Sequence, residues 1–168
     1  MHDIQEKSPL SILVMGVGNT LLTDEAAGPR ALERFAIAAD DLPNVTCLDA
    51  GTLSFTLAAT IGAADALIVF DAARLGAAPG SVRLLEGAEM DAFVRSGKLT
   101  VHEVGITDLL DMARVTGDLP ALRALIAIEP AEIGWGLSLS PAVEAALDGA
   151  VALARAQVGR WSQAEALS

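Results

Sequence analysis

The chain has 168 residues, 52% of them hydrophobic, and carries 22 acidic against 11 basic residues, for a net charge of −11 at pH 7. This length fits one domain with a substantial core, and the negative field would repel a nucleic-acid backbone. No apolar run approaches the roughly 18–20 residues of a membrane span, and the single cysteine excludes an internal disulfide or a multi-cysteine metal cluster.

Residues 1–10 lack the net positive charge of a secretory signal, so we expect a mobile N-terminal tail ahead of a single domain over 11–168. A reducing, cytoplasmic location is the expectation that follows. Cys47 lies in the apolar stretch VTCLDA and is predicted to be a core residue rather than a nucleophile, because buried structural cysteines are usually inert.

Apolar runs typical of buried strands alternate with helical patterns along the domain. Strands are predicted at 11–17, 44–50, 65–72, 80–86 and 123–129, and helices near 28–40, 52–63, 105–116 and 140–158. This alternation predicts an α/β fold, a three-layer sandwich with a twisted, mostly parallel five-stranded sheet and helices on both faces. The strand at 80–86 follows its predecessor through a short link without a clear helix, which allows an antiparallel direction for it.

Two of these helices carry clear signals. Apolar residues recur at the helical spacing i, i+3, i+4 and i+7 in Ile106, Leu109, Leu110 and Ala113. Gly117 suits the end of that helix, and Ser140 followed by Pro141 suits the start of the last one.

The first strand leads through a glycine turn into GNTLLTDEAAGPRALERF, residues 18–35. Because proline clashes with the carbonyl four residues back, the regular helix is expected to begin close to Pro29. The stretch TDEAAG then becomes a loop or an irregular first turn, with the carboxylates of Asp24 and Glu25 pointing outward.

A nucleotide-binding module is one reading of this strand, turn and helix. Gly16 and Gly18 fit the first two positions of a dinucleotide fingerprint, but Leu21 stands where the third glycine is needed. Asp24 and Glu25 would repel a pyrophosphate there, so this reading is the weaker alternative.

Open α/β sheets place their sites at the carboxyl ends of the strands. Glu25 follows the first strand and Asp71 ends the third, so a strand order 2-1-3-4-5 would bring them together. His102 precedes the helix at 105–116, and two carboxylates with one imidazole can hold nickel, zinc or copper. Asp24 and Asp49 are further candidates for lining the cleft.

Each of these residues also has a structural reading. Glu25 could be an acid stabilised at a helix N-terminus, and Asp71 could stabilise a turn. A lone histidine such as His102 could have a hydrogen-bonded structural role. Asp24 suits a cap or loop-stabilising role, and Asp49 beside Gly51 suits a turn.

Taken in order, five segments resemble the hydrogenase maturation endopeptidases, which remove a C-terminal extension from the large-subunit precursor of nickel–iron hydrogenases. The matching segments, which together span about four-fifths of the chain, are ILVMGVGNTLLTDEAAG (12–28), LDAGT (48–52), IVFDA (68–72), VHEVGITDLL (101–110) and GWGLSLSPAVEAAL (134–147).

This resemblance implies a protease whose metal-contacting trio is Glu25, Asp71 and His102. It implies a cytoplasmic, monomeric partner of the nickel-loaded large-subunit precursor, with the nickel carried by the substrate and other divalent metals able to occupy the site. The trio would recognise that nickel, and a water activated by the metal, with a carboxylate as general base, would attack the peptide. A non-catalytic nickel-binding chaperone is the alternative.

Two departures from the family pattern stand beside Glu25. Many relatives have glycine where this chain has Ala26, and an aliphatic residue where it has Pro29. Both changes stiffen the backbone, which leaves the trio intact and makes the local loop conformation the open question.

Overall fold

The computed structural model describes residues 7–51, 54–100 and 105–168. Five strands form one sheet: β1 (Ile12–Val17), β2 (Val45–Gly51), β3 (Ala66–Ala72), β4 (Val82–Glu86) and β5 (Leu122–Ile128). β1 is parallel to β2 and β3, β3 is parallel to β5, and β4 is antiparallel to β5. The prediction of a mostly parallel five-stranded sheet is confirmed.

The strand order is β2-β1-β3-β5-β4. The expected order 2-1-3-4-5 is therefore right for the first three strands and wrong at one edge, where β5 lies inside β4. β4 follows β3 after a link too short for a parallel crossover, which takes a dozen or more residues, so it runs antiparallel along the edge. The central pair that matters for the site, β1 beside β3, is as expected.

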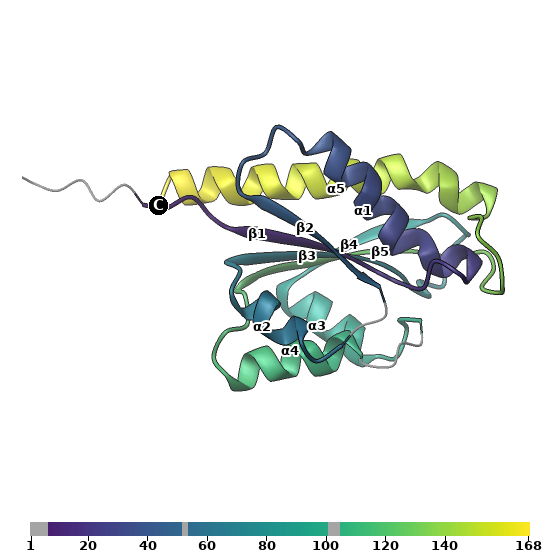
Figure 1. Ribbon diagram of the computed structural model, residues 1–168, viewed down its shortest axis with the longest axis horizontal. Coiled ribbons are helices and arrows are strands. Elements are labelled where there is room, and N and C mark those ends of the chain that lie inside the picture. The colour runs from purple at the N-terminus through teal and green to yellow at the C-terminus, as the bar shows by residue number, and fades with distance from the viewer. Residues whose placement is uncertain (1–6, 52–53, 101–104) are drawn as a thin grey trace, which may run out of the picture.

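Helices cover both faces of the sheet, which confirms the three layers (Figure 1). On one face lie α1 (Ala27–Ala38) and α5 (Pro141–Ala166). On the other lie α2 (Leu57–Gly62), α3 (Gly87–Arg95) and α4 (Ile106–Val115). A short 3-10 helix, η1 (Thr23–Ala26), precedes α1.

β3 is buried along its whole length because each face of the sheet carries its own core. Ile68 and Phe70 pack with α1 and α5, and the Phe70 ring lies 5.9 Å from that of Phe35. Leu67 and Val69, one residue out of phase, pack with α2, α3 and α4. Burial on both faces explains why the sequence of this strand is continuously apolar.

The helices depart from prediction in three ways. α3 was not predicted, although Met90, Phe93 and Val94 repeat at i, i+3 and i+4 and are buried. α5 extends past 158 to Ala166 because Trp161 continues its buried stripe. α2 is shorter than the predicted 52–63, of which 52 and 53 lie outside the described residues.

Cys47 is exposed, so the prediction that it lies in the core is wrong. It lies on β2, an edge strand whose residues are mostly exposed or half-buried. Partial burial by its neighbours raises the pKa of the thiol, which disfavours the nucleophilic thiolate.

The predicted tail falls partly outside the described residues, which begin at Lys7. The Lys7 ammonium forms an ion pair of 2.6 Å with Glu165 near the end of α5. In the part of the chain that the structure describes, no helix combines the length and apolar character that a bilayer crossing requires.

Candidate active site

Close backbone contacts bring the start of α1 against the carboxyl ends of β1 and β3. A β-carbon on Gly28 would lie 2.2 Å from the Val17 carbonyl oxygen and 2.5 Å from that of Phe70. A β-carbon on Gly18 would lie 1.9 Å from the carbonyl oxygen of Glu25. Glycine at both positions therefore fixes the backbone of Glu25 beside the end of β1, and the residue after Phe70 is Asp71.

Thr23 turns the chain at this point. Its φ of 35° is uncommon for a non-glycine residue and strained for a β-branched one. Hydrogen bonds hold it there: the Thr23 hydroxyl donates to the Glu132 carbonyl at 2.9 Å and accepts from the Gly134 N–H at 2.9 Å. The two carboxylates that follow, Asp24 and Glu25, then take up different surroundings.

Asp24 is fully buried and binds the segment that joins β5 to α5. Its carboxylate accepts hydrogen bonds from the N–H groups of Ala131 and Glu132, each at 2.9 Å, and from the N–H and hydroxyl of Ser140 at 2.7 and 2.8 Å. Burial acts to raise the pKa of Asp24, but these hydrogen bonds outweigh it and the pKa is lowered. Asp24 is thus a carboxylate that secures a loop.

Glu25 is 5% exposed and lines a pocket of about 490 Å³. The described residues that line the pocket with it are Leu22, Arg74, Gly97, Leu99, Thr100 and Ile133. The expectation that both carboxylates of TDEAAG point outward is wrong, because η1 forms and buries them. Glu25 nevertheless keeps an opening to this pocket.

Asp71 is fully buried near the end of β3, where it stands in register with Ala127 of β5. Its neighbours in the strand alternate between the two cores, so its position falls on the face covered by α2, α3 and α4. A carboxyl group wholly withdrawn from water at the carboxyl end of a central strand marks a functional candidate.

His102 lies outside the described residues. The described chain on its two sides is Thr100, which lines the pocket of Glu25, and Gly105, which precedes α4. Among residues 7–51, 54–100 and 105–168, no three His, Cys, Asp or Glu side chains could hold a metal ion together. The trio therefore stays a prediction, for which Glu25 and Asp71 supply a suitable pair of oxygen donors.

Two other acidic residues have structural contacts. The Asp49 carboxylate accepts the N–H of Gly51 at 2.9 Å, as a turn residue would, and its place in the cleft stays a prediction. Glu129, which sequence analysis missed, is 8% exposed and accepts the N–H of Leu75. An acid directly after the buried strand β5 was the signal that could have found it.

Arg74 is the cation of this pocket. It follows β3, and its N–H donates to the Lys98 carbonyl at 2.8 Å, while Ala73 pairs with Leu99. The Arg74 guanidinium forms no ion pair with any residue that the structure describes, and it faces the pocket that Glu25 lines. The pocket thus offers one carboxyl group and one cationic hydrogen-bond donor to a bound molecule.

Comparison with known proteins identifies related chains. A profile described as hydrogenase maturation protease matches residues 29–157. The hydrogenase expression/formation protein HupD of Rhodobacter capsulatus is 36% identical over 154 residues, which cover 91% of this chain and 73% of that protein. The hydrogenase 2 maturation protease of Escherichia coli K12 is 37% identical over 84% of this chain and 87% of its own length.

The fold is shared as well. The hydrogenase maturating endopeptidase HybD from E. coli superimposes with a TM-score of 0.80 at 35% identity, covering 90% of this chain and 93% of that one.

Proposed function

The chain belongs to the hydrogenase maturation protease family, and from that premise we propose that it removes the C-terminal extension of a nickel–iron hydrogenase large-subunit precursor once nickel has been inserted. The observation that carries the proposal is one buried carboxylate, Glu25, opening on a pocket at the carboxyl end of the sheet. Asp71 lies buried at the same end, beside the contact between Gly28 and Phe70.

Recognition of the precursor rests on the metal that it brings. Oxygen donors from Glu25 and Asp71 with a nitrogen donor from His102 suit a borderline divalent ion such as nickel. Thr100, two residues before His102 in the sequence, lines the pocket of Glu25. In this proposal nickel is part of the substrate, and the trio distinguishes nickel-loaded from nickel-free precursor by binding the metal.

The protein supplies position and proton transfer. A divalent cation lowers the pKa of a water that it binds, and a carboxylate within hydrogen-bond reach can accept the proton as general base. Glu25 is the better placed carboxylate for this role, since it lines the pocket while Asp71 is fully buried. Arg74 gives the same pocket a donor for a peptide carbonyl.

The test is processing of the cognate precursor by wild-type protein and by Glu25→Gln, Asp71→Asn and His102→Ala, followed by mass spectrometry of the large subunit. We expect each substitution to lower the rate by about 100-fold or more, in line with the loss of a residue that binds the reacting centre. Asp40→Asn is the matched control, a carboxylate-to-amide change at an exposed residue just after α1. It should process at the wild-type rate.

Nickel-free precursor forms the second arm. Equal cleavage of nickel-loaded and nickel-free precursor would remove the recognition role, and equal processing by all variants would show that the site is wrongly assigned. An unchanged large-subunit mass with wild-type protein, together with stable binding, would identify a nickel-binding chaperone instead of a protease.

The proposed role also suggests a cellular location and an oligomeric state. We propose that the protein acts as a monomer in the cytoplasm, where the precursor receives its metal. Gel filtration with light scattering and fractionation of cells would check the two statements separately.

A further inference from the structure

Exposed large apolar side chains gather in two groups on the described surface, apart from the single residues Ile37 and Leu167. Leu21, Trp135 and Leu137 are 51%, 84% and 69% exposed, and we call these three residues the Trp135 ridge. Phe55, Met112 and Val115 are 59%, 39% and 87% exposed, and they line a groove of about 630 Å³ by α4. Exposed apolar groups of this kind mark candidate interaction surfaces.

The ridge is formed by two chain segments that lie side by side. The Gly136 N–H donates to the Leu21 carbonyl at 3.0 Å, and the Thr23 N–H donates to the Gly136 carbonyl at 3.0 Å. Leu22 pairs with Gly136 in a parallel bridge. The ridge residues flank this ladder, one on the first segment and two on the second.

Hydrogen bonds from the interior hold the ridge in place. The buried Asp24 carboxylate binds both ends of the loop that carries Trp135, at Ala131 and Glu132 on one side and Ser140 on the other. Thr23 adds a bond to Gly134, next to the tryptophan. An aromatic side chain on a backbone that is already ordered loses little further freedom when it binds a partner.

The ridge is continuous with the proposed active site. Leu22 and Ile133, from the same two segments, line the pocket that contains Glu25. A specific protein interface buries about 800 Å² on each partner, which the mouth of this pocket cannot supply alone. A protein substrate that reaches Glu25 must therefore cover adjoining surface, and aromatic residues are enriched where interfaces bind tightly.

We infer that the Trp135 ridge is the docking surface for the hydrogenase large-subunit precursor, contacting apolar side chains of the polypeptide next to the scissile bond. This inference rests on the proposed function and adds the surface that sets affinity. Glu25, Asp71 and His102 act on the metal and the peptide bond, whereas the ridge holds the surrounding chain.

The experiment is steady-state cleavage of nickel-loaded precursor by wild-type protein, Trp135→Ala and Leu137→Ser. We expect KM to rise about tenfold or more for Trp135→Ala, with kcat within about twofold of wild type, because a truncated hot spot weakens binding. Trp135→Phe should recover most of the affinity, and thermal melts should match wild type because the side chain is exposed.

Val115→Ser, at a residue 87% exposed, is the matched control, and Met112→Ser, at a residue 39% exposed, is a second one, since both remove exposed apolar groups from the α4 groove. We expect no change in KM for either. If the ridge variants raise KM no more than these controls, or lower kcat instead, the docking inference is overturned while cleavage by wild type keeps the proposed function. A wild-type protein that does not cleave overturns both.

Discussion

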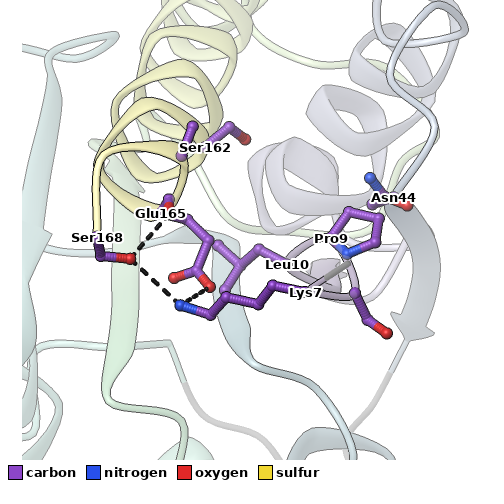
Figure 2. Close-up of a pocket in the computed structure, with 9 residues that line it drawn as sticks. Lys7, Pro9, Leu10, Asn44, Ser162, Glu165 and Ser168 are labelled. Carbon is purple, nitrogen blue, oxygen red and sulfur yellow. Dashed lines mark hydrogen bonds and ion pairs between the residues drawn. The ribbon is translucent and has the colours of Figure 1, made fainter. Parts of the chain in front are cut away.

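The sheet has a pocket at each end, and the two pockets differ in chemistry. Figure 2 shows the one at the amino ends of the strands, about 360 Å³, where Leu10 and Asn44 meet the end of α5. Its acid, Glu165, is paired with Lys7 at the surface. At the carboxyl ends Glu25 is 5% exposed and still lines a pocket of about 490 Å³.

Volume does not identify the functional pocket, since the groove by α4 is larger than either, at about 630 Å³. The Glu165 side chain is 29% exposed and its partner Lys7 is 65% exposed, so water and one surface ion pair stabilise its charge. Asp24 is charged inside the protein only because four hydrogen bonds from backbone and serine groups replace the lost water. Buried acidic residues held by hydrogen-bond donors therefore distinguish the carboxyl end of the sheet from the amino end.

Among substitutions at the two ends of the sheet, Gly28→Ala should change the free energy of unfolding most. The added β-carbon would meet backbone oxygens of Val17 and Phe70, which cannot rotate away, so we expect a loss of about 3–5 kcal/mol in the free energy of unfolding. Gly159→Ala is the matched control at the other end, on the exposed side of α5 with nothing near it. It should stabilise the protein by about 0.5–1 kcal/mol. Urea denaturation of both variants gives the two values, and equal changes would contradict the close packing.

Asp24→Asn should have the next largest effect on the free energy of unfolding. The amide keeps one acceptor oxygen and turns an NH₂ group toward donors, so we expect a loss of about 1–3 kcal/mol at pH 7. Precursor cleavage should fall less than in Glu25→Gln, because Asp24 holds the loop and does not enter the pocket. A variant with wild-type stability would show that these hydrogen bonds contribute nothing.

The pH dependence of that loss is a separate prediction. The pKa of Asp24 is lowered below its ordinary value of 3.8, so its contribution is present above pH 3.8 and is lost as the pH falls through the folded-state pKa. The difference in unfolding free energy between wild type and Asp24→Asn should therefore narrow below about pH 4. Denaturation curves at a series of acidic pH values measure it, and a difference that widens would contradict the lowered pKa.

Lys7→Gln should have the smallest effect. The Lys7 side chain is 65% exposed and its ion pair with Glu165 is on the surface, where such pairs contribute about 0–1 kcal/mol. We expect a change below about 0.5 kcal/mol that disappears in high salt, and an unchanged rate of precursor cleavage. A marked loss of cleavage would show that the amino end of the sheet takes part in function.

Strand and helix positions were largely predictable because burial dictates sequence patterns. β3 reads as a continuous apolar run, and the buried face of α4 repeats as Ile106, Leu109, Leu110 and Ala113. The order of β4 and β5 was not predictable, since it depends on which strand covers an edge. Cys47 was misjudged because an apolar stretch on an edge strand resembles one in the core.

The site was partly predictable as well. The positions of Glu25 and Asp71 at strand ends follow from the alternation of strands and helices. The burial of Glu25 does not, because it depends on η1, which Asp24 ties to a loop 107 to 116 residues further along the chain. Contacts between distant segments leave no local pattern, which is also why the Trp135 ridge was not recognised.

The lone, exposed cysteine on the edge strand has a practical consequence. Two molecules kept without reductant have a route to a covalent dimer through Cys47, since neither copy offers a second thiol inside the chain. Such a dimer would place two edge strands β2 next to each other and would resemble a native assembly in gel filtration. Cys47→Ser, or fresh dithiothreitol, separates an artefact of air oxidation from true self-association.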